Sequence, residues 1–162
     1  FLATVHRAEN VDVPDRLEGI VDALDNLDAP VVLPIHPHTR RALGSRIDAL
    51  RGSLRVIDPV GYLEMLELVR SARAILTDSG GVQKEAYMMG VPCITLRDET
   101  EWTETVDAGW NTLVGADRDR IAAAVGNPAP PVDRPRFYGD GHASERIARY
   151  TRELIESKDI RQ

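Results

Sequence analysis

The sequence has a single cysteine, no long apolar run and no excess of positive charge. Because Cys93 stands alone among the 162 residues, no disulfide can form within one chain, and we expect a cytoplasmic location. No apolar run approaches the roughly 20 residues that cross a bilayer, and no signal peptide is visible, so we predict no membrane partner. The net charge of −6 argues against nucleic acid as a partner.

Common cofactor and metal signatures are missing as well. The G-x-G-x-x-G dinucleotide pattern, typical of NAD enzymes, and the Walker A lysine motif do not occur in the sequence, so we predict no cofactor. His36 and His38 stand two residues apart and would share one face of a strand. No third ligand follows nearby and Pro37 disturbs the geometry, so we predict no metal site.

What the sequence does contain is a regular alternation of apolar runs and helical patterns. The expected strands cover 1–5, 31–35, 54–57, 73–77, 93–96 and 111–114. The expected helices cover 14–27, 41–50, 61–72, 80–90, 101–108, 118–125 and 143–157. In the third of these helices, Leu63, Leu66 and Val69 are expected to face the sheet.

The alternation of strands and helices predicts an α/β fold with an open doubly wound, mostly parallel six-stranded sheet of the Rossmann-like kind. The proline-rich tract 127–135 is interpreted as a surface linker, so residues 1–162 are predicted to form one domain.

The chain is organised around the turn Asp78-Ser79-Gly80-Gly81, which links an apolar strand to a helix. Ser79 is a good N-cap residue, and the two glycines lack the Cβ atoms that would block a ligand. A helix that begins here points unpaired N–H groups and a partial positive charge at the space above Gly80 and Gly81, which favours phosphate. Taken alone, Ser-Gly-Gly is more often only a cap and a turn. The surrounding residues decide between these two interpretations.

Polar residues near this turn extend the predicted site. Glu85 lies one turn further into the helix, where its carboxylate could accept hydrogen bonds from sugar hydroxyls. Arg97 ends the following strand, and the acidic residues behind it would either bind hydroxyls or hold Arg97 in place. Right-handed crossovers bring the carboxyl ends of the first, fourth and fifth strands to one crevice, so His6, Ser79 and Arg97 are expected to meet.

Three stretches together resemble one enzyme family. They are HRAEN at 6–10, LTDSGGVQKEAYMMGVPCITLRDETEW at 76–102 and YGDGHAS at 138–144. In order and spacing they are similar to motifs of the non-hydrolysing UDP-N-acetylglucosamine 2-epimerases, and the resemblance covers nearly the whole chain. It implies the second, UDP-binding half of a glycosyltransferase-B-type two-domain fold. It also implies an isomerase that interconverts UDP-GlcNAc and UDP-ManNAc by eliminating UDP across C1–C2 and adding it back.

The resemblance implies a set of residues that bind UDP or the UDP-N-acetylhexosamine. They are His6, Arg7, Asn10, Met65, Ser79, Gly80, Gly81, Glu85, Arg97, Thr100 and Glu101. His6 is also a possible catalytic residue, whereas the main acid and base carboxylates of the family lie in the first domain. His36 is a candidate for a second, activating UDP-GlcNAc site. Met65 is also consistent with a core methionine. Trp102 and Thr103 depart from the pattern, since many relatives carry arginine and proline there.

The two ends of the chain suggest further partners. Phe1 stands inside a predicted strand, so we expect an upstream domain before it, as the resemblance also implies. The apolar positions of the last helix, 143–157, are Ile147, Tyr150, Leu154 and Ile155. They occupy more of the helix circumference than one sheet face needs, so we expect contact with the upstream domain or, in a homodimer, with a second copy. The isolated chain is then expected to bind UDP without turnover. The alternatives are the donor half of a glycosyltransferase and a non-catalytic UDP-sugar-binding module.

Overall fold

A single parallel sheet forms the centre of the molecule. The computed structural model describes residues 1–128 and 130–159. Its strands are β1 (Leu2–Thr4), β2 (Val31–Pro34), β3 (Leu54–Ile57), β4 (Ile75–Thr77), β5 (Cys93–Thr95) and β6 (Asn111–Leu113). They lie in the order β3-β2-β1-β4-β5-β6, and every paired strand is parallel to its neighbour. The predicted open doubly wound sheet is confirmed, and the strand order reverses between β1 and β4, where such sheets bind ligands.

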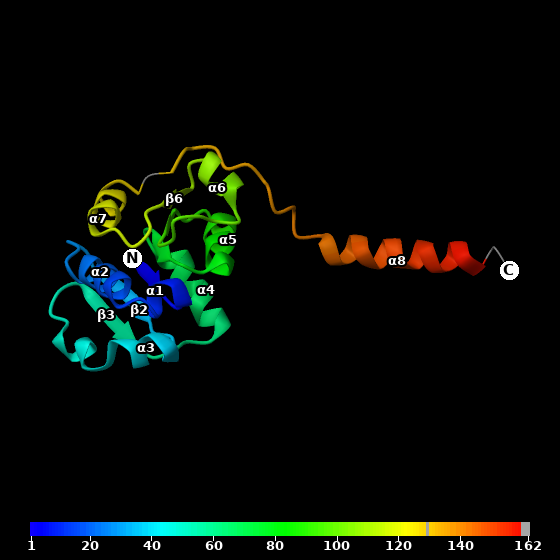
Figure 1. Cartoon of the computed structure of the whole chain (residues 1–162). Helices are drawn as coiled ribbons and strands as arrows, with labels where there is room; N and C mark the ends of the chain where they lie inside the picture. Colours follow the sequence, from blue (N-terminus) through cyan, green and yellow to red (C-terminus); the bar gives the residue numbers. More distant parts are fainter. Residues whose placement is uncertain (129, 160–162) are drawn as a thin grey trace.

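Helices cover both faces of the sheet (Figure 1). They are α1 (Ala8–Val11), α2 (Pro14–Asp25), α3 (Pro37–Leu43), the 3-10 helix η1 (Gly44–Ala49), α4 (Tyr62–Ser71), α5 (Gly80–Met89), α6 (Thr103–Asp107), α7 (Arg118–Gly126) and α8 (Ala143–Asp159). Neighbouring strand residues point to opposite faces. Ala3, Leu76 and Ile94 therefore pack with α2 and α7, while Leu2, Ile75 and Cys93 pack with α4 and α5. Within the described residues, no helix has both the length and the apolar content to cross a bilayer.

Two local predictions were wrong. The helix expected at 41–50 begins earlier, at Pro37, because His36 caps it by accepting from the His38 N–H and proline suits the first helical position. It ends at Gly44, whose φ of 48° breaks the helix before η1. In α4, Leu63 does not face the sheet but is 78% exposed. The stripe that packs against the core consists of the buried Val69 and the partly buried Met65, Leu68 and Ala72. Their helical spacing puts Leu63 on another side.

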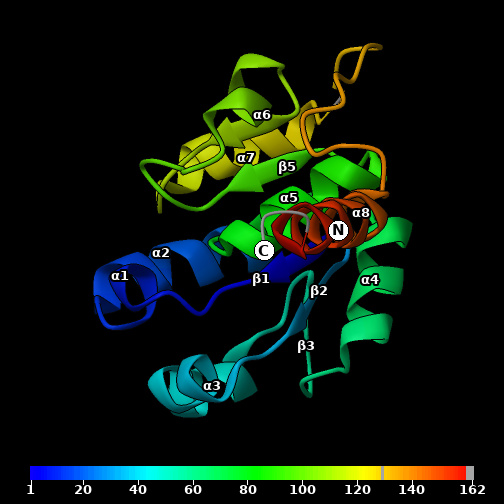
Figure 2. The same cartoon turned by 90° about the vertical axis from the view of Figure 1, so that its right-hand side faces the viewer.

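The last helix lies apart from the sheet. Figure 1 shows α8 extending away from the other elements, and Figure 2 views it nearly end-on. Ile147, Tyr150 and Ile155 are 65%, 62% and 58% exposed. The apolar positions predicted for this helix therefore face solvent in the isolated chain, which is the arrangement expected of a surface that meets another domain or a second copy.

Because α8 packs so little against the domain, we expect its amides between residues 144 and 156 to exchange with solvent much faster than those of α2. Hydrogen exchange followed by mass spectrometry would measure this in the chain and in a protein that adds the upstream domain. Protection that rises with chain concentration would indicate a homodimer through α8. Strong protection in a monomeric chain would instead show that α8 belongs wholly to this domain.

Candidate functional site

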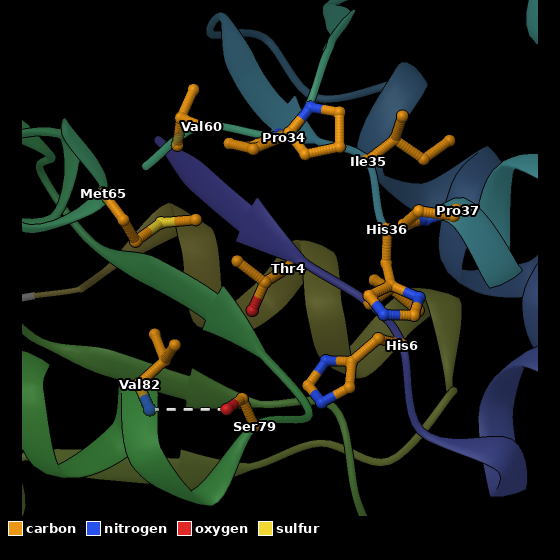
Figure 3. A pocket seen from close by; sticks show the side chains of 12 residues that line it. Thr4, His6, Pro34, Ile35, His36, Pro37, Val60, Met65, Ser79 and Val82 are labelled. Carbon is orange, nitrogen blue, oxygen red and sulfur yellow. Dashed lines mark hydrogen bonds between the residues drawn. The ribbon is translucent and has the colours of Figure 1, made fainter. Parts of the chain in front are cut away.

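The carboxyl ends of the central strands carry the predicted site. Thr4, Thr77 and Thr95 end β1, β4 and β5 in register, so the residues that follow them emerge at one edge of the sheet. A pocket of about 370 Å³ opens at this edge. The residues that line it are Thr4, Val5, His6, Pro34, Ile35, His36, Pro37, Pro59, Val60, Met65, Ser79 and Val82. Figure 3 shows His6 and His36 at one end of the pocket and Val60 and Met65 at the other. The pocket thus has a polar end and an apolar end.

The Ser79-Gly80-Gly81 turn has the predicted form. Ser79 caps α5, its hydroxyl accepting from the Val82 N–H at 3.4 Å. Gly80 is closely surrounded: a Cβ there would lie 3.2 Å from Nε1 of Trp102, 3.6 Å from Glu101 Oε2 and 3.8 Å from Arg7 Nη2. A Cβ at Gly80 would thus press on the Trp102 ring and make ordinary contacts with Glu101 and Arg7. Arg7 and Glu101, which the sequence places far apart, both lie at this turn.

Arg97 is held between two carboxylates. It is only 6% exposed. Its Nε donates to Glu9 Oε1 at 3.0 Å, and its Nη1 donates to the Glu101 carboxylate at 2.9 and 3.1 Å. The hydrogen bonds that Arg97 donates to Glu101 raise the pKa of Arg97; partial burial opposes this shift, and the carboxylate of Glu9 adds to it. The expectation that acidic residues hold Arg97 in place is confirmed. A phosphate bound to Arg97 would share the guanidinium with Glu9. The contact between Glu9 and Arg97 was not predicted, because the two residues are 88 positions apart in the sequence.

Asp78 is a second buried contact at the site that sequence reasoning did not single out. Its side chain is fully buried, and it accepts hydrogen bonds from the His6 and Arg7 backbone N–H groups and from Asn10 Nδ2. Burial opposes ionisation, but the hydrogen bonds from His6, Arg7 and Asn10 outweigh it, and the pKa of Asp78 is lowered. The only signal was its position directly before Ser79. Asp78 thereby fixes the loop after β1 against the end of β4.

Asn10 lies beneath the surface of the site. It is 0% exposed, and its amide donates to Asp78 and to the Leu96 carbonyl while accepting from Arg16 Nε. In the structure this side chain holds the loop after β1 in place, and its direct contact with a ligand stays a prediction.

Three more predicted residues lie around α5. The Thr100 hydroxyl donates to the buried Gln83 Oε1 at 2.6 Å, on the same side as Trp102. Glu85 lies on the side of α5 that faces α4, and Met65 belongs to α4 itself. Burial raises the pKa of Glu85, against a hydrogen bond with Tyr62 that lowers it. Met65 lines the pocket and also packs against the second core cluster. It therefore has the core role considered for it, and its contact with a ligand stays a prediction.

His36 lines the same pocket from the N-cap position of α3, just after β2. Its ring centroid lies 5.8 Å from that of His6, at a tilt of 41°. His38 points elsewhere, with Nε2 2.7 Å from Asp12. In residues 1–128 and 130–159, no group of three or more His, Cys, Asp or Glu side chains is arranged to hold a metal ion.

Comparison with known proteins identifies the family. The family model described as UDP-N-acetylglucosamine 2-epimerase matches residues 1–152. The chain belongs to this family. It is 51% identical over 159 residues to the UDP-2,3-diacetamido-2,3-dideoxy-D-glucuronate 2-epimerase of Pseudomonas aeruginosa, covering 95% of this chain and 44% of that protein. The chain therefore spans less than half of this curated relative.

Solved structures agree with this assignment. The UDP-GlcNAc 2-epimerase of Methanocaldococcus jannaschii, in complex with UDP-GlcNAc and UDP, superposes with a TM-score of 0.87 at 42% identity, over 94% of this chain and 45% of that one. The calicheamicin glycosyltransferase superposes with a TM-score of 0.58 at 17% identity, over 96% of this chain and 38% of that one. This second likeness concerns the fold alone and supports the glycosyltransferase-B-type architecture.

Trp102, which stands where many relatives carry arginine, packs beside Gly80. Its Nε1 is buried beside Gly80 and has no hydrogen-bond partner among the described residues. Lys84 Nζ lies 4.5 Å from the Trp102 ring centroid and 4.8 Å from that of Tyr138, a cation–π arrangement. Tyr138 also donates to Glu104 at 2.9 Å. Tyr138, the first residue of the YGDG motif, thus packs against Trp102, whose Nε1 lies beside Gly80.

Proposed function

We propose that this chain is the UDP-binding domain of a UDP-GlcNAc 2-epimerase, a protein that interconverts UDP-GlcNAc and UDP-ManNAc. The observation that carries the proposal is the capped turn Ser79-Gly80 at the switch point of the sheet, with Arg7 and His6 beside it in a family of UDP-sugar epimerases. N–H groups at a helix N-terminus together with arginine suit a diphosphate.

In this proposal UDP lies along the pocket. The uracil occupies the apolar end at Val60 and Met65, and the ribose hydroxyls bind Glu85. The diphosphate reaches the turn before α5, close to His6 and Arg97. This order follows the change from apolar to polar lining along the pocket. Thr100, Glu101 and the glycines Gly80 and Gly81 complete the proposed contacts.

The chemistry requires a stabilised leaving group. The proton at C2 of the sugar is weakly acidic, so it is removed as the C1–O bond breaks and UDP departs with the electron pair. Proton return at C2 on the other face, followed by attack of UDP at C1, gives the epimer. This chain stabilises the departing diphosphate. The carboxylates that move the C2 proton are assigned to an upstream domain.

The 51% identical relative from Pseudomonas aeruginosa favours a second candidate substrate, a UDP-2,3-diacetamido uronate. Offering both sugar nucleotides to a protein that carries this chain and the upstream domain would decide between them. UDP-GlcNAc alone also tests the glycosyltransferase alternative, because a transferase needs an acceptor to release UDP. A homodimeric assembly and a cytoplasmic location stay predictions.

We expect the isolated chain to bind UDP without epimerising UDP-GlcNAc, because it offers one wall of the cleft. Titration calorimetry should detect UDP binding that is weaker than in the protein with both domains. Measurable conversion of UDP-GlcNAc by the chain alone would contradict the assignment of the acid and base carboxylates to an upstream domain. No detectable UDP binding, in a chain shown to be folded, would contradict the proposed function itself.

A further inference from the structure

The two oxygens of the buried Asp78 carboxylate have different hydrogen-bond partners. Its Oδ2 receives three N–H groups, from the His6 backbone at 3.0 Å, the Arg7 backbone at 2.9 Å and Asn10 Nδ2 at 3.1 Å. Its Oδ1 faces His6 alone, receiving the backbone N–H at 3.1 Å and lying 3.2 Å from the imidazole Nδ1. The carboxylate therefore has one oxygen for the loop and one for the histidine.

This arrangement determines where His6 carries its proton. An ionised carboxylate only accepts hydrogen bonds, so the nitrogen that faces it must be the protonated one. Nδ1 of His6 then keeps its proton in both the neutral and the charged ring, and Nε2 is the one nitrogen that gains or loses a proton. The His6 side chain is 36% exposed, whereas that of Asp78 is 0% exposed. Nε2 is thus the nitrogen left for a ligand in the pocket that His6 lines with Ser79 (Figure 3).

We propose that Asp78 is a positioning residue that locks His6 in the Nδ1–H tautomer, so that Nε2 acts as a single-site acid and base for the departing diphosphate. The inference rests on the proposed function. As the C1–O bond breaks, its electron pair leaves on the diphosphate oxygen, and Nε2–H gives its proton to that oxygen. When the oxygen attacks C1 again, neutral Nε2 takes the proton back. The cycle needs no further reactant, and the C2 proton is moved by other groups.

Replacing Asp78 with asparagine makes a sharp test, because the two oxygens have different partners. The amide oxygen should take the Oδ2 position, where three donors converge. The amide NH2 then faces His6 Nδ1 and donates to it, which forces the proton onto Nε2. Exchange of aspartate for asparagine beside a catalytic histidine has the same tautomeric consequence in serine proteases.

The experiment is long-range ¹H–¹⁵N correlation NMR on the chain with labelled histidine and neutral imidazole rings. The His6 signals are identified by their loss in His6→Gln. We expect the unchanged chain to carry the His6 proton on Nδ1 and Asp78→Asn to carry it on Nε2. Asn10→Ala is the matched control, since it removes a partner of Oδ2 and leaves the His6 contact intact; it should keep the Nδ1 proton. If neutral His6 in the unchanged chain carries its proton on Nε2, the proposal is wrong, whatever the variants show.

Adding UDP separates this proposal from the proposed function. We expect UDP to shift the His6 Nε2 resonance strongly in the unchanged chain. UDP that binds by calorimetry without moving that resonance overturns the role of His6 and leaves UDP binding standing. A chain that has the Nδ1–H tautomer but binds no UDP overturns the proposed function, and the assigned role of Nε2 is lost with it.

Discussion

Replacing Arg97 with alanine is expected to weaken UDP binding far more than uridine binding. A charge-assisted contact to phosphate contributes roughly 1.5–3 kcal/mol, which corresponds to about a 10- to 150-fold change in Kd. The loss should fall towards the upper end of this range. Without Arg97, the carboxylates of Glu9 and Glu101, now 2.9–3.0 Å from the guanidinium, would face the diphosphate unpaired. Titration calorimetry with UDP and with uridine measures both affinities.

Glu85→Gln is the companion change. If Glu85 binds the ribose, the substitution should weaken UDP and uridine by similar factors. Arg70→Ala is the control, because Arg70 pairs with Glu67 on the exposed side of α4 and should leave both affinities unchanged. The opposite pattern, with Glu85→Gln specific for UDP and Arg97→Ala affecting both ligands equally, would mean that the ligand lies in the reverse orientation. A thermal melt of each variant separates loss of contact from loss of fold.

A second large effect is expected on stability, from Gly52→Ala. Gly52 lies where the chain enters β3, against the end of α2. A Cβ on Gly52 would lie 1.7 Å from the Asp25 carbonyl oxygen and 2.8 Å from its carbonyl carbon. That backbone is fixed, since the Ser53 N–H donates to the same oxygen at 2.8 Å. Moving it should lower the free energy of unfolding by roughly 3 kcal/mol.

Gly126→Ala is the matched control for this change. Gly126 ends α7, and a Cβ there meets nothing within 4 Å. Alanine should therefore leave stability unchanged or raise it by up to about 1 kcal/mol, through better helix propensity and a less flexible unfolded chain. Urea denaturation of both variants gives the comparison. Equal stability of Gly52→Ala and the unchanged chain would show that the junction of α2 and β3 differs from the one described.

The sequence by itself determined the sheet and the central turn. Strands such as β2 and β4 are short apolar runs bounded by turn residues, and the turn at Ser79 combines a capping hydroxyl with two glycines. These are local signals, since burial of a strand and capping of a helix depend on residues within a few positions. The alternation of strands and helices, with right-handed crossovers, then predicted that His6, Ser79 and Arg97 lie at one edge of the sheet.

Only the tertiary structure decided which charged groups meet. Asp78 contacts His6, 72 residues earlier, and Arg97 contacts Glu9, 88 residues earlier. Nothing in local spacing distinguishes Asp78 from an ordinary turn aspartate or Glu9 from a solvated loop carboxylate. Their roles arise because β1 lies beside β4 and the loops after β1 and β5 meet, and burial there makes each unpaired donor or charge costly. The pairings at the site are therefore consequences of strand order, which local spacing does not encode.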